Sequence, residues 1–240
     1  MLNILLHLAD DALILGHRNS EWTGHGPVLE QDIALSNISL DLVGQSRHFY
    51  QLAATLKNDG TTEDHLAFLR DAPEFLNCQL VEQDNGHWGK TILRQFFFSV
   101  YTSGLYRQLQ EHPHRELAAI AAKSIKETAY HLRWSSEWVI RLGKGTTESH
   151  NKMQDALNEL WPFTSELYTP APYEQDLADF GALKQNWSRQ VSEVLFHASL
   201  QMPQNVEMKS GGKEGKHTAL LAALLLEMQY MQRTYPGMEW

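Results

Sequence analysis

The sequence predicts an all-helical fold, and three observations support this prediction. Apolar and small side chains recur at intervals of three and four over residues 115–142, which is the spacing of one helix face. Further long segments end at Gly, Pro or Asn, as helices commonly do. The sequence shows no alternating strand pattern bounded by turn signals and no repeat of fixed period. We therefore predict one helical domain over residues 1–240, organised around the helix at 115–142.

Composition and charge exclude several classes of protein. The formal net charge of -9 argues against a nucleic-acid partner, because phosphates would be repelled. The single cysteine, Cys78, cannot form an internal disulfide and fits a reducing compartment. The longest apolar run, at 219–226, is far shorter than the roughly 20 residues of a membrane span. Residues 1–8 lack the basic leader of a signal peptide. We expect a cytoplasmic protein with no membrane partner.

The first half of the chain predicts three helices. A helix at 3–15 is expected to end at Gly16 and to be followed by a polar loop at 17–27. A long helix is predicted at 28–57, and a short one at 61–73. The apolar face of the long helix is formed by Leu29, Ile33, Leu35, Ile38, Leu40, Leu42 and Val43.

The second half predicts five more helices, at residues 87–110, 115–142, 147–167, 180–201 and 218–235. Pro162 is expected to bend or split the third of these, because proline removes a helix hydrogen bond. The last helix is apolar nearly all round over 219–226, which predicts burial in a core or against another chain.

The pattern of acids and histidines can be compared with that of a di-iron site. A four-helix bundle that holds two irons needs Glu-x-x-His motifs on two helices, with both side chains projecting inward. On the helix at 115–142, His131 faces inward, but Thr128 stands three residues before it. The three segments that do have an acid three residues before a histidine contain Gly or Pro, and no Asp or Glu lies between Asp84 and Glu111. The residues alone therefore predict no di-iron pair and no catalytic site.

Two acid–histidine pairs with a spacing of four leave alternatives open. Glu127 with His131 and Glu193 with His197 each share a helix face, and we interpret them as bonded neighbours on their own helices. One alternative is an enzyme with a non-standard metal site, built from Asp10 or Asp11 together with these four side chains. Another is a free-standing helical protein that binds an acyl-CoA.

Several stretches in order resemble one known family. They include Gly24-His25, Asp32-Ile33-Ala34-Leu35, Leu40-Asp41-Leu42 with Gly44-Gln45, Leu80-Val81-Glu82-Gln83, Tyr130-His131-Leu132-Arg133, Gly211-Gly212-Lys213 and Glu227-Met228-Gln229-Tyr230. These stretches resemble the non-catalytic ferritin-like subunits of bacterial phenylacetyl-CoA epoxidases, also called phenylacetate-degradation C subunits. The resemblance covers nearly the whole chain.

The resemblance implies a ferritin-like four-helix bundle with additional C-terminal helices. It implies a multicomponent oxygenase in which a related catalytic subunit holds two irons and binds phenylacetyl-CoA, while a reductase subunit supplies electrons from NADPH. This chain would be a structural, metal-free subunit that scaffolds the catalytic one, with no catalytic or cofactor-binding residues of its own.

The same resemblance places former metal-ligand positions at Asp11, Leu42, Gln45, Phe98, Thr128 and His131. At most Asp11 and His131 could still bind a metal, and two ligands cannot hold a di-iron pair. Obligate interfaces of this kind are large and hydrophobic. The candidates for the contact with the catalytic subunit are the apolar faces of the helices at 3–15, 28–57 and 218–235.

Overall fold

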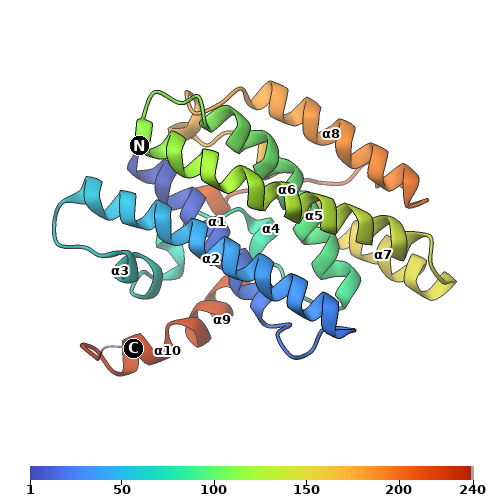
Figure 1. Cartoon of the computed structure of the whole chain (residues 1–240), viewed down its shortest axis with the longest axis horizontal. Helices are drawn as coiled ribbons and strands as arrows, with labels where there is room; N and C mark the ends of the chain where they lie inside the picture. Colours follow the sequence, from blue (N-terminus) through green and yellow to red (C-terminus); the bar gives the residue numbers. More distant parts are fainter. Residues whose placement is uncertain (239–240) are drawn as a thin grey trace.

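The computed structural model describes residues 1–238, and within that range it is built from helices without a strand (Figure 1). The all-helical prediction is confirmed. The four longest helices are α1 (Leu2–Ser20), α2 (Leu29–Lys57), α5 (Trp88–Leu109) and α6 (Arg115–Gly143). Helix α1 packs along α2, α5 packs along α6, and α2 packs against α6. This arrangement is consistent with the ferritin-like bundle.

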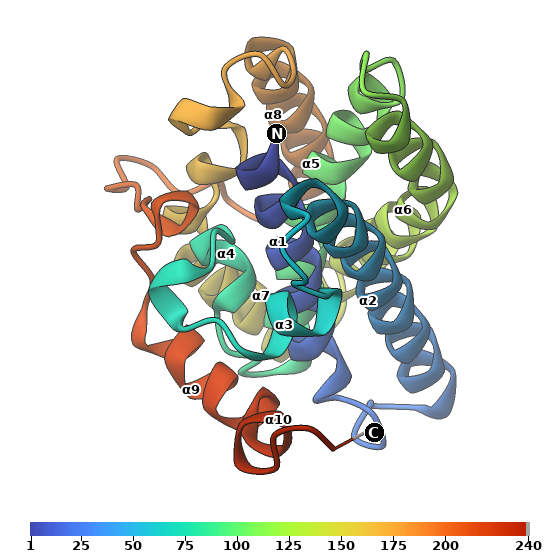
Figure 2. The same ribbon diagram turned by 90° about the vertical axis from the view of Figure 1, so that its left-hand side faces the viewer.

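Helix α1 lies in the middle of the molecule, with other elements around it (Figure 2). Besides α2, it contacts α4 (Gln79–Glu82) and the 3₁₀ turn η4 (Pro172–Glu174). Its polar residues Asp10 and Asn19 are buried along with its apolar ones. Of the three candidate helices for the contact with the catalytic subunit, α1 is therefore the one whose apolar residues are covered within its own chain.

The prediction that the first helix ends at Gly16 is wrong. Gly16 instead lies inside α1 and allows α1 and α2 to approach closely. A Cβ atom at this position would lie 3.1 Å from Val43 Cγ2 and 3.3 Å from Leu42 Cβ. The helix continues to Ser20, and Arg18 in its last turn donates two hydrogen bonds to the carbonyl of Glu82. Tertiary contacts thus outweigh the local tendency of glycine to end a helix.

The apolar residues of α2 are divided between two faces. Leu35, Ile38 and Leu42 are buried in the bundle core. A second group lies on the outside, and we call it the α2 outer stripe. It consists of Leu29, Ile33, Leu40 and Val43, which are 72, 51, 69 and 40 % exposed. Steps of four, seven and three residues place these side chains on one line along the helix.

The accessory helices are shorter than predicted, and each has an identifiable stop. Helix α7 (Thr147–Leu160) gives way at Pro162 to the 3₁₀ turns η2 (Trp161–Phe163) and η3 (Ser165–Tyr168). Helix α8 (Phe180–His197) ends four residues before the predicted end, where Ser199 has a φ of 60°. Pro162 therefore splits the predicted helix.

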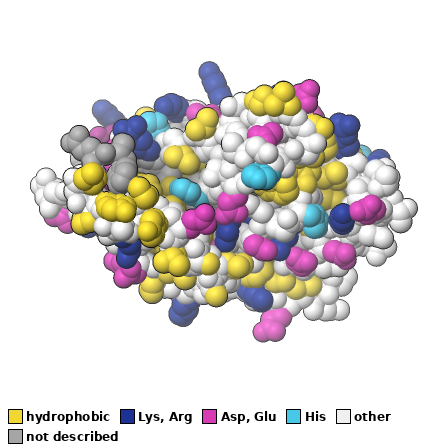
Figure 3. All heavy atoms as spheres, turned by 90° about the horizontal axis from the view of Figure 1, so that it is seen from below, with side chains coloured by type: hydrophobic (Ala, Val, Ile, Leu, Met, Phe, Trp, Pro, Cys, Tyr) yellow, Lys and Arg dark blue, Asp and Glu magenta, His cyan; other side chains and the backbone are white. Residues whose placement is uncertain are grey.

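The C-terminal helix is divided into α9 (Ala219–Met228) and α10 (Tyr230–Thr234). Between them, the Gln229 side chain donates hydrogen bonds to the carbonyls of Ala67 and Arg70. Figure 3 shows hydrophobic side chains gathered near the C-terminus, where Leu226, Tyr230 and Met238 are exposed. Burial in the core of the single chain is therefore incomplete for this helix, and the alternative of burial against another chain stays a prediction.

The short elements connect these helices. They are α3 (Glu63–Phe68) and the 3₁₀ turns η1 (Ala72–Glu74) and η5 (Gly212–Glu214). Among residues 1–238, no helix is both long and apolar enough to span a lipid bilayer.

Candidate functional site

The interior of the bundle contains the positions at which the resemblance places former metal ligands. Leu42 of α2 and Phe98 of α5 are each 2 % exposed and belong to the hydrophobic core. Thr128 and His131 of α6 are buried as well. Apolar side chains at two positions and a hydroxyl at a third leave too few oxygen and nitrogen donors for two metal ions. These residues do not fit a di-iron centre.

Gln45 joins three helices through neutral and charged hydrogen bonds. Its amide nitrogen donates to Glu127 Oε2 at 2.8 Å, and its amide oxygen accepts from the Tyr106 hydroxyl at 3.2 Å. Burial raises the pKa of Tyr106, so the phenol remains protonated and acts as a donor. Gln45 therefore serves as a bridge between α2, α5 and α6, and both polar atoms of its amide have hydrogen-bond partners.

His131 is bonded across the α2–α6 seam. Its Nε2 lies 2.9 Å from Asp41 Oδ2. On either side of this pair, His48 contacts Lys123 and the Trp134 ring donates to Gln31. The interpretation that Glu127 and His131 bond to each other along α6 is wrong, because each finds its partner on α2.

Asp11 is directed toward the segment that precedes α4. One carboxylate oxygen accepts from the Cys78 backbone N–H at 2.7 Å, and the other lies 3.7 Å from Cys78 Sγ. Burial raises the pKa of Asp11 to about 6, partly offset by the nearby His7. Asp11 and His131 thus have partners in different parts of the fold.

The residues of the alternative metal site are likewise dispersed. Asp10 accepts hydrogen bonds from Arg70, from Tyr50 and from the backbone of Leu76. Glu193 and His197 are exposed on α8. Among residues 1–238, the group whose ligand atoms come close enough for a metal is instead His7, Asp11 and Cys78.

A set of buried acidic residues that sequence reasoning missed holds the glycine-rich loop before α9. Glu166 accepts from the backbone N–H groups of Gln79, Gly211 and Lys213. A Cβ atom at Gly212 would collide with the Asn77 carbonyl, so the loop approaches this backbone closely. The signal in the sequence was the Gly211-Gly212-Lys213 run, whose role here is close packing.

Glu82 and His217 form a second set of hydrogen bonds that holds the loop before α9 in place. His217 Nδ1 lies 2.8 Å from Glu82 Oε2, and Nε2 lies 2.8 Å from the Phe75 carbonyl oxygen. Both neighbours are acceptors when Glu82 is ionised, so the geometry suits a ring that donates from both nitrogens. Burial alone lowers the pKa of His217, but the bonds to Glu82 and Phe75 outweigh it, and the net result is a raised pKa.

We expect the unfolding free energy to fall as pH rises through the raised pKa of His217. The folded state holds this proton more tightly than the unfolded state, so the contribution is complete below the ordinary value of 6.5 and is lost above the folded value. Urea unfolding across this pH range should show the decline, and His217→Gln should flatten it. The exposed residue His25 provides the control, and an equal flattening in His25→Gln would contradict the assignment.

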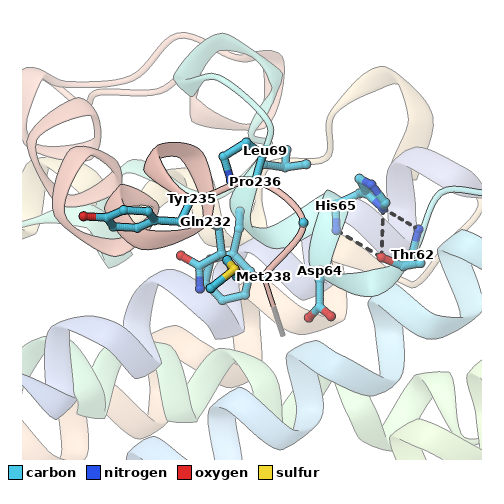
Figure 4. A pocket seen from close by; sticks show the side chains of 10 residues that line it. Thr62, Asp64, His65, Leu69, Gln232, Tyr235, Pro236 and Met238 are labelled. Carbon is cyan, nitrogen blue, oxygen red and sulfur yellow. Dashed lines mark hydrogen bonds between the residues drawn. The ribbon is translucent and has the colours of Figure 1, made fainter. Parts of the chain in front are cut away.

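A surface hollow of about 670 Å³ lies between α3 and the end of the chain (Figure 4). In its wall, His65 Nδ1 lies 2.9 Å from the Thr62 hydroxyl, and the two residues cap the start of α3. This bonding is structural. None of the former ligand positions lines this hollow.

Comparison with known proteins gives two findings. A family model described as phenylacetic acid catabolic protein matches residues 1–240. The chain is also 46 % identical, over 98 % of its length and 97 % of the relative's, to a protein of Escherichia coli K12 that is named as the C subunit of 1,2-phenylacetyl-CoA epoxidase.

Proposed function

This chain belongs to the phenylacetic acid catabolic protein family, and on that basis we propose that it is a structural subunit of a phenylacetyl-CoA epoxidase. In this proposal a separate catalytic subunit holds the two irons and binds the substrate, and a reductase subunit supplies electrons from NADPH. The chain described here contributes no di-iron centre. Its function is to bind and support the catalytic subunit.

The observation that carries the proposal is the filling of the bundle interior. Leu42 and Phe98 occupy two of the former ligand positions, and Gln45 is bonded on both sides of its amide. Core side chains filled in this way are closely packed, and these positions offer no set of carboxylates to hold two irons. A role in association is what such a chain can offer to an oxygenase.

The α2 outer stripe supports the same conclusion. Its four apolar side chains extend over the 15 residues from Leu29 to Val43, which is roughly 20 Å of helix. Exposed apolar residues that line up in this way are typical of protein interfaces. We assign the contact with the catalytic subunit to this stripe and leave the exposed residues of α9 and α10 to other subunits.

Co-expression with the catalytic subunit tests the proposal directly. The two chains should elute together in size-exclusion chromatography, and iron analysis of the separated chains should find the iron pair with the catalytic subunit. If this chain alone held two irons and oxidised phenylacetyl-CoA, the proposal would be wrong. Elution as separate species at micromolar concentration would also contradict it.

Replacing His131 with alanine is expected to lower stability and to leave turnover nearly unchanged. The substitution removes the hydrogen bond to Asp41, at a cost on the order of 1 to 3 kcal/mol. Urea unfolding of the isolated chain measures this cost. In the reconstituted complex, turnover per assembled catalytic subunit should match the wild type. A loss of turnover with assembly preserved would indicate that His131 takes part in the chemistry.

A further inference from the structure

The α2 outer stripe has charged neighbours on α6. The two helices lie side by side on one side of the molecule, with α1 and α5 behind them (Figures 1 and 2). Asp41 of α2 bonds to His131 of α6. Four residues further along α2, Gln45 bonds to Glu127, which lies four residues earlier on α6, so the helices run antiparallel. The middle of the stripe therefore lies level with residues 126–133 of α6.

Two cations in this part of α6, Lys126 and Arg133, are exposed on its outer side. Their separation of seven residues places them on one line along the helix. Within residues 1–238, neither side chain forms an ion pair with a carboxylate. The Arg133 Cζ atom lies 5.9 Å from the centre of the Tyr130 ring, and Arg133 does not pair with Glu137 one turn further on. Both positive charges are therefore available to another molecule.

Helix α6 is more positive than the chain as a whole. It carries five Lys and Arg residues against three Asp and Glu, whereas the chain has a formal net charge of -9. Another cation in its middle, Lys123, is directed to α2, where its ammonium lies 2.8 Å from His48 Nε2. Lys126 and Arg133 are thus the cations that face outward beside the stripe. A basic strip on an acidic protein favours a partner surface that is acidic at this place.

The size of a stable interface brings these two cations into the contact. Stable complexes bury roughly 800 Å² or more on each partner, and neighbouring helices pack only about 8 to 10 Å apart. A contact of that size centred on Leu40 and Val43 extends over the adjacent part of α6. Covering Lys126 and Arg133 removes their water, which is unfavourable unless carboxylates replace it.

We propose that the surface of the catalytic subunit that covers the α2 outer stripe carries Asp or Glu side chains opposite Lys126 and Arg133. The apolar stripe supplies affinity, while the ion pairs on α6 fix the orientation and disfavour partners with neutral or basic surfaces. This assignment rests on the proposed function, because the partner is again the catalytic subunit, and it adds the chemistry of the partner's surface.

Charge reversal at two salt concentrations tests the proposal in the complete chain. Isothermal titration calorimetry with the purified catalytic subunit should show wild-type binding about tenfold weaker at about 500 mM KCl than at about 50 mM, because salt screens ion pairs. Lys126→Glu/Arg133→Glu should bind about 100-fold more weakly than the wild type at low salt. Its affinity should rise with salt as repulsion is screened, a change of sign that misfolding would not produce.

Two cations on α8 provide the matched control. Lys184 and Arg189 are exposed, and Lys184→Glu/Arg189→Glu changes the net charge by the same amount as the α6 double variant. The α8 variant should bind within about twofold of the wild type and should keep the wild-type response to salt. An equal loss of affinity in the two double variants would show that net charge governs binding, and would overturn the proposal.

Zero-length cross-linking of the complex identifies the partner groups directly. A carbodiimide joins a lysine amine to a carboxylate in contact with it, so mass spectrometry should find Lys126 linked to an Asp or Glu of the catalytic subunit. Lys126→Gln should abolish this link. Lys184, which is also exposed, should form no link with the catalytic subunit.

The outcomes separate this proposal from the proposed function. If the chains bind and Leu40→Glu weakens binding, but the α6 reversal has no effect and Lys126 forms no cross-link, only the proposal for α6 is wrong. Tighter binding of the α6 double variant would also overturn it, because the partner surface would then be basic. If the wild-type chains fail to bind at any salt concentration, the proposed function is wrong, and the proposal for α6 with it.

Discussion

Replacing Leu40 with glutamate should weaken binding of this chain to the catalytic subunit by about 10- to 100-fold. Leu40 is 69 % exposed in the middle of the α2 outer stripe, and glutamate would place a charge where the proposed interface excludes water. The isolated chain should keep its melting temperature, because the side chain packs little within its own subunit. Isothermal titration calorimetry with the purified catalytic subunit measures the change in affinity.

Phe196 on α8 offers a matched control. It is 79 % exposed, more than Leu40, and it lies on α8 and not on α2, which carries the α2 outer stripe. Phe196→Glu should leave the affinity within about twofold of the wild type. If Phe196→Glu weakened binding and Leu40→Glu did not, the interface would lie on α8, and the assignment to α2 would be wrong.

Replacing Arg70 with alanine should destabilise the chain by about 3 to 5 kcal/mol. Arg70 bonds to both oxygens of Asp10, which is completely buried, and also to the Tyr50 hydroxyl and the carbonyls of Leu66 and Glu74. Its removal leaves the Asp10 carboxylate without its counter-charge in a site without water contact. Chemical unfolding monitored by circular dichroism measures the loss.

An exposed ion pair provides the comparison for Arg70. Lys152 Nζ lies 2.6 Å from Glu148 Oε1, yet both side chains are more than half exposed. Lys152→Ala should change stability little, because water and salt already screen this pair. A cost for Lys152→Ala as large as that for Arg70→Ala would show that burial of Asp10 does not govern the effect.

The long helices were predictable because their patterns are local. Helix α6 begins at Arg115 as expected and ends at Gly143, one residue beyond the predicted end, since its stripe of small and apolar residues spans the whole helix. The division at Pro162 was also predictable, because proline acts on its own turn. Gly16 was misjudged, because its role depends on the closeness of α2, which no local pattern records.

The candidate site was predictable only in part, for a related reason. That Leu42, Phe98 and Thr128 cannot act as carboxylate ligands follows from their identities alone. The partners of Asp11, His131 and Glu127 could not be found in this way, because each is bonded to a residue between 67 and 90 positions away in the sequence. The group formed by His7, Asp11 and Cys78 was missed for the same reason, since Cys78 lies in a segment far along the chain from α1.

The burial of α1 also bears on how the chain is made. This helix is synthesised before every other element described here, yet Arg18 in its last turn bonds to the Leu220 carbonyl, and His7 in its first half faces Glu174. The ribosome must therefore complete most of the polypeptide before α1 can find its final surroundings. Until then its apolar surface is exposed to solvent or to chaperones, which makes the nascent chain prone to aggregation.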